Sequence, residues 1–509
     1  MSIISNKWNI RGIIIGFSLV LSSLLMSINV HSQEHKDTLQ YCKGLKDAGN
    51  IKDSYRILKT YINKHPKDFN ATWFIAKLAY WNWEIENAKE YYQAALDMQP
   101  TNYYLKLDYA MMLVDIGDLN KSIKYLLQYV SYDSLSKDAQ LYLAKAYYWK
   151  GNTEAALKVL NHLPSTFKNN ESAEALKNEI ILVKAANCSI QTGYDFDNQP
   201  LKHFYTGATY SKFNNSLLNW AIAIQNNQFK TDSTNNNSYI IEASNKFTFF
   251  NLGMQINTRI GLSILPFASI NTFEGALNFR KKIYKGFSLL LAVDRKPYFF
   301  TVSSTQQAVV PTTLIAAIAV DNFKQFSSNI QYQQQLFDGN TIKSFSAWVL
   351  SPALKLNKFS IKAGYAYQQA DADINNYTTN KSIDSLIAHY ATPITGYYIP
   401  YFTPKSQEIH SVLLWLNYKP SGRFSITATG SYGLYATLLN PCLYLNINSI
   451  NKPIIDKGYI SQTYTPIDAS LKVLYKYNER VSVNASYEYQ MTNYYTGQFI
   501  NATVNILLP

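Results

Sequence analysis

Few residues of this chain have types and spacings suited to catalysis. His410 and Ser411 are neighbours and would supply a general base and a hydroxyl nucleophile, the combination that a hydrolase acting at a lipid face needs. They stand at the start of a segment that alternates like a β-strand, in which adjacent side chains point to opposite faces. The two side chains therefore cannot form a nucleophile–base pair, and we expect no enzyme activity.

Signals for bound metals, cofactors and nucleic acids are missing from the sequence. None of the seven histidines forms a metal-spaced pair in a helix, and there is no CxxC motif and no glycine-rich phosphate loop. The net charge of +13 would suit nucleic acid, but the chain has no basic run and no recognition motif. We expect no metal, no cofactor and no nucleic-acid partner. The dispersed lysines instead suit anionic lipid headgroups or an acidic glycan.

Charged residues of both signs recur on one face of alternating segments in the second part of the chain. If the alternation is read literally, the charges that share the polar face are Glu242, Arg259, Glu274, Arg280, Asp294, Lys362, Lys472, Lys476 and Glu488. Inside a wide barrel these charges either solvate one another or, with tyrosine hydroxyls, line a pathway for a hydrophilic polymer. Both interpretations require the segments to be strands of a barrel.

The segments that would position these charges lie between 188 and 509. In 481–489, valine, alanine and tyrosine alternate with serine, asparagine and glutamate, which is the period of a strand with one apolar and one polar face. Sixteen such runs begin near residues 188, 202, 217, 237, 251, 268, 284, 311, 324, 341, 357, 407, 422, 461, 479 and 494. No second long helical pattern occurs in this part of the sequence.

Three features favour a transmembrane barrel over a soluble β-sandwich. Many runs reach about ten residues or more, longer than most soluble strands. The chain holds 41 Tyr and 25 Phe, and the runs concentrate them near their ends, as an interfacial girdle requires. The long connectors, at 230–236, 295–310, 369–406 and 436–460, all follow odd-numbered runs, whereas connectors after even-numbered runs are short. We therefore predict an antiparallel outer-membrane β-barrel of about 16 strands over 188–509.

The first third of the chain carries four copies of a 34-residue pattern, in frames that start at His35, Phe69, Tyr103 and Lys137. The eighth and twentieth positions are always small, and the twenty-fourth is large and apolar: Cys42, Ala76, Ala110 and Ala144; Ser54, Ala88, Ser122 and Ala156; Leu58, Tyr92, Leu126 and Leu160. Glycine supplies the turn in three frames. This spacing predicts an all-α tetratricopeptide-repeat solenoid over 33–187, closed by a capping helix at 171–187.

Residues before the repeats indicate export. Lys7 and Arg11 precede an apolar run at 13–26, and 30–32 offers a small-residue cleavage site, so 1–32 is predicted to be a secretory signal rather than a membrane anchor. The repeats would then lie in the periplasm, beneath an outer membrane. Their expected free face, suited to a periplasmic protein partner, includes Trp73, Lys77, Tyr80, Tyr104, Asp108 and Tyr148.

Signal, repeats and barrel together resemble the YaiO family of outer-membrane β-barrel proteins. The same plan is found in the outer-membrane subunits of bacterial cellulose and poly-N-acetylglucosamine exporters. The stretch 397–405, YYIPYFTPK, is similar to the aromatic–proline segment that precedes a late barrel strand in cellulose exporters. Four repeats are fewer than those exporters carry, which favours the YaiO-like arrangement. The resemblance implies an outer-membrane location more than it implies an activity.

The sequence therefore supports two functions. The first is a pore or accessory component for export of a polysaccharide across the outer membrane, in contact with outer-membrane lipids and, through the repeats, with a periplasmic protein. The alternative is a non-conducting outer-membrane anchor whose repeats act as a periplasmic protein- or peptidoglycan-binding adaptor.

Overall fold

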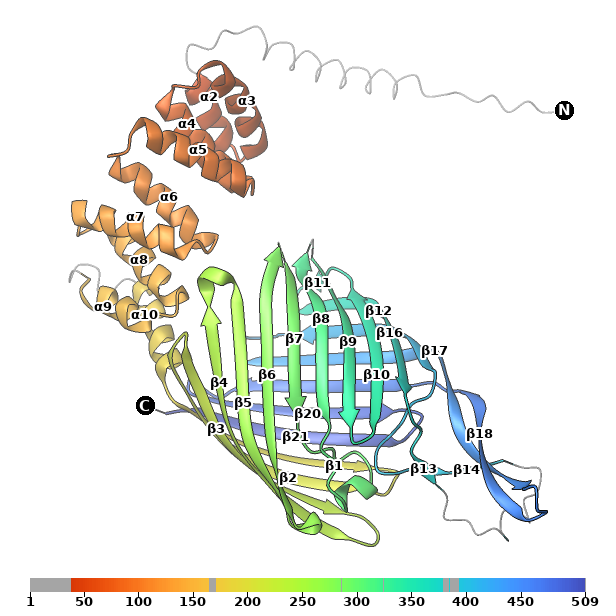
Figure 1. Cartoon of the computed structure of the whole chain (residues 1–509). Helices are drawn as coiled ribbons and strands as arrows, with labels where there is room; N and C mark the ends of the chain where they lie inside the picture. Colours follow the sequence, from red (N-terminus) through yellow and green to blue (C-terminus); the bar gives the residue numbers. More distant parts are fainter. Residues whose placement is uncertain are drawn as a thin grey trace, which may run out of the picture. The chain divides into compact units, whose positions relative to one another are not determined.

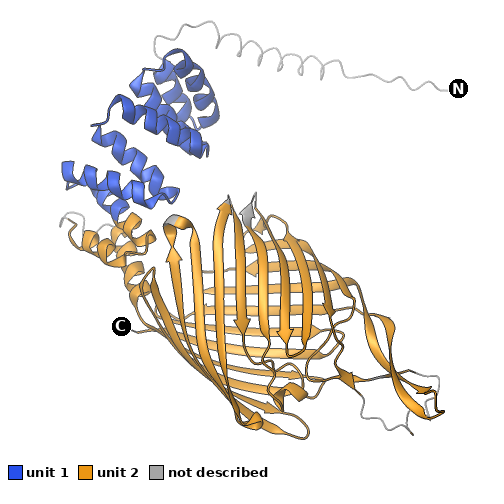
Figure 2. Cartoon of the chain, in the orientation of Figure 1, with its two compact units in different colours: residues 1–143 blue, residues 144–509 orange. Residues whose placement is uncertain are grey.

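The structure is a computed structural model that describes residues 38–163, 171–284, 286–323, 325–378, 384 and 393–508. The expected signal at 1–32 and the start of the first repeat frame at His35 lie outside the described residues. The chain forms two compact units, residues 1–143 and 144–509, which Figure 2 shows in blue and orange.

The first unit consists of paired helices that follow the repeat frames (Figure 1). The helices are α2 (Thr38–Asp47), α3 (Ile51–Lys64), α4 (Phe69–Trp81), α5 (Ile85–Met98), α6 (Tyr103–Asp115) and α7 (Leu119–Tyr132), and α8 (Lys137–Trp149) continues into the second unit. The second, third and fourth frames start on the first residues of α4, α6 and α8, so the predicted repeats are confirmed. None of the helices in the described residues is both long and apolar enough to cross a membrane.

The recurring small and large residues form the core of the repeats. Cys42 and Ala110 at the eighth position are fully buried, as are Leu58 and Leu126 at the twenty-fourth. The small side chains let paired helices approach closely, and the large ones fill the groove between them. The turn residue Gly117 has a φ of 84°, in the left-handed region that glycine adopts without strain.

The second unit begins with α9 (Thr153–Asn161) and α10 (Glu171–Lys184), which lead into a large sheet. The barrel strands are β1 (Asn187–Asp197), β2 (Lys202–Asn215), β3 (Leu218–Lys230), β4 (Asn235–Phe249), β5 (Met254–Leu265), β6 (Ile270–Tyr284), β7 (Phe287–Arg295), β8 (Thr312–Phe323), β9 (Phe326–Phe337), β10 (Asn340–Leu350), β12 (Phe359–Ala372), β16 (Gln407–Tyr418), β17 (Phe424–Ile447), β19 (Ile467–Lys476), β20 (Val481–Met491) and β21 (Thr496–Leu507). Neighbours in this order pair antiparallel, and β21 pairs with β1. The described chain therefore forms a closed barrel of sixteen strands, as predicted.

Five further strands pair outside this ring. They are β11 (Leu354–Leu356), β13 (Tyr377–Thr378), β14 (Ile394–Thr395), β15 (Tyr397–Tyr398) and β18 (Pro453–Thr463). The end of β17 pairs with β18 to form a ribbon that projects beyond the barrel (Figure 1). The two longest connectors, 296–311 and 373–406, follow the seventh and eleventh barrel strands, so both lie at the same end of the barrel.

Three expectations about this region are wrong. The connector expected at 230–236 is only 231–234, because the asparagines at the start of β4 pair with β3 instead of forming a loop. The stretch 436–460 is not a loop but the β17–β18 ribbon, which tolerates Pro441 because a strand at a sheet edge does not need every N–H. The run expected from 461 spans the end of β18, and the barrel strand itself, β19, begins at Ile467.

Candidate functional site in the barrel lumen

The two faces of the barrel wall differ in polarity. Large apolar side chains remain exposed on the outer face, among them Ile260 at 71% and Phe273 at 80%. Their strand neighbours Arg259 and Glu274 line a cavity inside the barrel. Strands such as β5, of 12 residues, are long enough to cross the apolar layer of a bilayer. The closed wall and its apolar exterior make the second unit an outer-membrane β-barrel.

All the charged residues predicted to face the lumen lie on barrel strands. Glu242 is on β4, Arg259 on β5, Glu274 and Arg280 on β6, Asp294 on β7, Lys362 on β12, Lys472 and Lys476 on β19, and Glu488 on β20. Exposed apolar residues alternate with them, for example Ile241 beside Glu242 and Tyr487 beside Glu488. The structure gathers some of these charges and leaves others apart. Lys362, for instance, lies over the ring of Trp415 at 5.5 Å.

Arg259 is the centre of a charged cluster on four adjacent strands, β4 to β7. Its guanidinium lies 3.1 Å from a carboxylate oxygen of Glu242 and 2.5 Å from one of Asp294. On the next strand Glu274, only 5% exposed, accepts a hydrogen bond from the Ser263 hydroxyl. Two carboxylates therefore pair with one guanidinium and a third lies on the neighbouring strand, while the buried Nε of Arg259 has no hydrogen-bond partner among the described residues.

This cluster forms one wall of a cavity of about 440 Å³ within the barrel. The lining combines carboxylates, amides and aromatic rings, including Asp195, Asp197, Glu242, Glu274, Gln191, Gln225, Asn227, Phe196, Phe299, Phe300, Tyr495 and Phe499, with the cations Arg259 and Lys296. Such a lining suits a ligand that presents apolar faces and hydrogen-bonding edges together.

His203 connects a second set of polar groups across β1, β2 and β3. Its Nδ1 lies 3.0 Å from a carboxylate oxygen of Asp195, and its Nε2 lies 3.1 Å from the amide oxygen of Asn227. The imidazole also stacks on Phe229, with ring centroids 4.6 Å apart. These residues are not among those predicted from the sequence, although the alternation with exposed Phe204 on β2 places His203 on the inner face.

Two connectors meet at the end of the barrel away from α10, and the first of them lines the cavity with Phe299 and Phe300. We call residues 296–311 and 393–406 of these connectors the loop lid. Lid residues Thr301 and Thr403 are at most 2% exposed. The Thr301 hydroxyl donates a hydrogen bond to the Pro400 carbonyl, which joins the two connectors, and Gln199 of the β1–β2 connector donates to the Phe300 carbonyl at 3.0 Å.

Contacts between aromatic rings connect the lid to both sides of the barrel. Tyr298 meets Tyr401 edge-on at 6.4 Å between ring centroids, and Phe402 stacks on Tyr494 of the β20–β21 turn at 4.8 Å. β7 is the seventh and β20 the fifteenth of sixteen barrel strands, so these contacts join opposite walls. Burial raises the pKa of the Tyr298 and Tyr494 hydroxyls, which therefore remain protonated.

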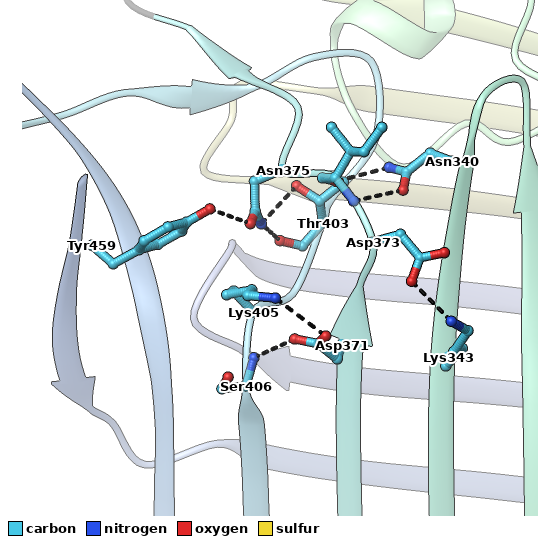
Figure 3. Close-up of polar contacts among 10 residues, drawn as sticks. Asn340, Lys343, Asp371, Asp373, Asn375, Thr403, Lys405, Ser406 and Tyr459 are labelled. Atoms are coloured by element: carbon cyan, nitrogen blue, oxygen red, sulfur yellow. Dashed lines mark hydrogen bonds and ion pairs between the residues drawn. The ribbon is translucent and has the colours of Figure 1, made fainter. Parts of the chain in front are cut away.

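Polar contacts fasten the second lid connector to the rim of the barrel (Figure 3). Asp371, near the end of β12, accepts hydrogen bonds from Lys405 at 3.3 Å and from the Ser406 backbone N–H at 2.8 Å. Further along the same connector, the Asn375 amide donates to the Thr403 carbonyl at 2.7 Å. These contacts link the described residues at the two ends of the connector to each other.

The candidate catalytic pair from the sequence does not come together. The β16–β17 pairing shifts register between His410 and Ser411. The His410 ring lies 2.5 Å from the Tyr365 hydroxyl and 3.2 Å from a carboxylate oxygen of Glu408, rather than against Ser411. Within the described residues no group of three or more His, Cys, Asp and Glu side chains is placed to hold a metal ion.

The residues expected on the free face of the repeats fall into separate groups. Trp73 and Lys77 on α4 both contact Asp108 on α6, the indole N–H donating at 2.8 Å. The Tyr80 hydroxyl on α4 donates to the Asp115 carboxylate, which lies further along α6 than Asp108. Tyr104 packs edge-on against Tyr132 at 6.1 Å.

The last of these residues, Tyr148, belongs to the second unit, where its hydroxyl donates to Glu179 at 2.9 Å. Burial first, and then this carboxylate, raise the pKa of Tyr148 to about 12. Its hydroxyl is thus a donor within that unit rather than a free group.

Comparison with known proteins gives a family match for part of the chain. A family model described as tetratricopeptide repeat matches residues 117–180. No curated protein sequence matches the chain. Among solved structures, a bacterial polysaccharide outer membrane secretin is similar with a TM-score of 0.46 at 7% identity, covering 64% of this chain and 99% of that one.

Two other solved structures are similar to separate parts of the chain. A loop-deletion mutant of OmpT, an outer membrane protein of Vibrio cholerae, has a TM-score of 0.31 at 10% identity and covers 63% of this chain and 98% of its own. Pseudomonas aeruginosa pilF has a TM-score of 0.26 at 17% identity and covers 28% of this chain and 66% of its own.

Proposed function

We propose that the barrel is a gated outer-membrane pore that passes a polysaccharide or oligosaccharide, with the loop lid as its gate. The observation that supports this most directly is the lidded cavity, in which aromatic rings stand beside carboxylates and amides. A sugar ring has an apolar face that packs on aromatic side chains and hydroxyl edges that donate to carboxylate and amide oxygens. A pore lined in this way conducts such a polymer without binding any one position tightly.

The charges of the cavity favour some glycans over others. Its carboxylates, Asp195, Asp197, Glu242 and Glu274, outnumber its cations, Arg259 and Lys296. An acidic sugar entering the cavity would meet like charge at close range, where the low dielectric strengthens repulsion. We therefore expect neutral or amine-bearing saccharides to pass more readily than acidic ones.

The lid has the features of a part that opens. Within the described residues, the buried hydroxyls of Tyr398 and Tyr494 have no hydrogen-bond partner. A buried hydroxyl without a partner destabilises the closed lid by about 1–3 kcal/mol relative to an open lid, in which water hydrogen-bonds to that hydroxyl. Closure thus depends on ring contacts and a few hydrogen bonds, which a polymer end entering the lumen can replace.

The proposed orientation places the lid outside the cell and the repeats in the periplasm. α10 enters β1 at the end opposite the lid, and the long connectors share the lid end. Outer-membrane barrels keep short turns on the periplasmic side and long loops outside. The repeats would then stand where a periplasmic protein partner can reach them, and the outer face of the barrel would contact outer-membrane lipids.

Sugar flux through proteoliposomes tests the pore. A variant in which 297–309 is replaced by a short glycine–serine turn removes half of the lid, and the same replacement at 448–452, in the ribbon tip, is the matched control. We expect the lid variant to pass neutral cello-oligosaccharides and amine-bearing chitosan oligosaccharides faster than the unaltered chain and the control. Acidic oligogalacturonates should pass through the lid variant more slowly than either of these two kinds of oligosaccharide. No flux through a correctly folded lid variant would contradict the proposal.

A second function deserves the same test because one observation favours it. The lid aromatics join opposite walls of the barrel, as a permanent plug would. In that case the barrel is a non-conducting anchor and the repeats act as a periplasmic adaptor for a protein or for peptidoglycan. Removing half of a permanent plug would still leave the other connector in place, so the anchor predicts no flux in any of the three proteins.

A further inference from the structure

The repeats of the first unit form an open pocket of about 420 Å³ that has no part in the proposed pore. It lies among α4, α6 and α8 and is lined by Tyr80, Trp81, Trp83, Asp108, Asp115 and Tyr142, among others. We call it the Trp83 pocket. Trp83 is 81% exposed, so most of its indole surface is free for contact with another molecule. The Trp81 ring is 42% exposed and already has the Lys46 ammonium 6.0 Å from its centroid.

Trp83 differs from the glycines that occupy the turn position of the other repeats. It occupies the fifteenth position of its frame, where the other three frames have Gly49, Gly117 and Gly151. Like those glycines, it adopts a left-handed backbone, with a φ of 60°. A side chain with a Cβ is strained in this region, and the exposed indole regains little by packing. Folding therefore does not explain this residue, whereas a role in binding does.

The charges of the pocket are unequal. Lys77 forms an ion pair with Asp108, which also accepts the Trp73 indole N–H. Asp115, seven residues further along α6, accepts a hydrogen bond from the Tyr80 hydroxyl at 2.7 Å. No lysine or arginine pairs with Asp115 in the part of the chain that the structure describes. The pocket therefore holds one carboxylate without a cationic partner, beside exposed indole rings.

We infer that the Trp83 pocket binds the cationic side chain of a partner polypeptide, an arginine or a lysine, with Asp115 as its counter-ion. A guanidinium or ammonium over an indole face is attracted by the ring quadrupole, and tryptophan is the strongest of the aromatic residues in this contact. A charged hydrogen bond to Asp115 adds direction and specificity. The inference does not depend on the pore, because it concerns residues of the first unit alone.

Other ligands fit the pocket less well. A peptide ending in a free carboxylate would face Asp115 and the already paired Asp108, and would be repelled. A neutral sugar would use the indoles but would leave Asp115 without a cation. The neighbouring Tyr142 adds no negative charge of its own, since burial and then the Asp115 charge raise the pKa of its hydroxyl and keep it protonated.

Fluorescence anisotropy with the full-length chain in detergent tests this inference. The probes are a labelled, end-capped Gly-Ser-Arg-Ser-Gly peptide and the same peptide with neutral citrulline in place of arginine. We expect saturable binding of the arginine peptide that weakens with added salt, and at least about tenfold weaker binding of the citrulline peptide. Equal affinities for the two peptides, or no binding of either at about 1 mM, would overturn the inference.

Two substitutions and a control separate binding from folding. Asp115→Asn should weaken binding of the arginine peptide about tenfold or more, since the charged hydrogen bond is lost. Trp83→Gly restores the residue of the other frames, so it should fold at least as well and still lose affinity. Asp97→Asn, on an exposed position of α5 outside the pocket, should bind like the unaltered chain. Unchanged binding in Asp115→Asn and Trp83→Gly would contradict the assignment, and cello-oligosaccharide binding that is lost in Trp83→Gly would assign the pocket to sugars instead.

Discussion

The helical repeats and the barrel bury opposite kinds of side chain. In the repeats, Leu58 and Leu126 are fully buried, and charges such as Asp53 stay at the surface. In the barrel, Ile260 and Phe273 are more than two-thirds exposed, while carboxylates face the interior. Both arrangements follow from one rule, that apolar groups leave water. The difference between the two regions is the medium outside each of them, which is water around the repeats and lipid around the barrel wall.

This comparison also separates two roles of polar residues. In the repeats, polar side chains at helix ends cap backbone N–H groups, as Asp68 does for α4 by accepting from the Ala71 N–H at 3.0 Å. In the barrel, the backbone is satisfied by neighbouring strands, so Arg259 and its carboxylates are not needed for that purpose. Polar groups that the fold itself does not require are candidates for a role beyond folding.

The largest effect should come from opening a cavity in the repeat core. Leu126→Ala removes a fully buried side chain and should destabilise the first unit by about 2–5 kcal/mol. The barrel comparison is Leu291→Ala, at a position 45% exposed on the outer face, where lipid refills the space and the loss should be much smaller. Helical circular dichroism and gel mobility of the folded barrel, followed during denaturation, report the two units separately. Equal losses at both positions would mean that the barrel exterior is packed rather than lipid-exposed.

A charge on the outer face should come next. Ile260→Arg, at the middle of β5, should destabilise the barrel by about 2–4 kcal/mol if this face meets the bilayer core. The matched variant Asn257→Arg, on the inner face of the same strand, should be tolerated because water reaches the lumen. Heat-modifiable migration on gels after refolding into lipid measures both. Similar losses from the two variants would show that the assigned faces are wrong.

A gain of stability is expected at the turn of the second repeat. Trp83→Gly relieves the left-handed strain of a residue with a Cβ and should stabilise the first unit by about 1 kcal/mol. The corresponding change in the opposite direction, Gly117→Trp, should destabilise it, because Gly117 has a φ of 84°. Thermal unfolding followed by helical circular dichroism gives both values. A destabilised Trp83→Gly chain would show that Trp83 contributes to the core and is not kept for binding.

The smallest expected effect is a pH dependence of the repeats. Burial alone would raise the pKa of Glu84, but hydrogen bonds from Tyr55, Asn87 and Asn82 outweigh it and lower that pKa below its ordinary value. A carboxyl whose pKa is lowered by folding stabilises the fold above its ordinary pKa and loses that contribution as pH falls through the folded value. Unfolding of the first unit should therefore become easier below about pH 4. Glu84→Gln should flatten this part of the pH profile, and an unchanged profile would rule out Glu84 as its source.

The sequence predicted the regular parts of both regions for different physical reasons. The repeats could be found because close helix packing requires a small residue at fixed positions, as Cys42 and Ala110 show. The strands could be found because a wall between lipid and water requires alternation, which placed Glu242 and Arg259 on the inner face. Neither kind of periodicity is present in segments that lie outside the packed helices and the barrel wall.

The lid could not be predicted for that reason. Its contacts join residues far apart in the sequence, such as Thr301 with Pro400 and Gln199 with Phe300, and no local pattern encodes them. The aromatic stretch from 397 was noticeable in the sequence, but its place over the lumen depends on Tyr494 and the opposite wall. The ribbon at 436–460 reads as a loop in the sequence because asparagines and Pro441 are typical of turns.

The central claim, that the lid gates a polar pore, is tested most directly by single-channel current in a planar bilayer. On a background with the native Cys42, Cys188 and Cys442 replaced, Phe402→Cys and Tyr494→Cys are joined by a cleavable bifunctional thiol reagent, which holds the lid to the opposite wall. We predict no conductance while the link is intact and step-like openings after a reducing agent cleaves it. Equal conductance before and after cleavage, or none in either state, would contradict the account.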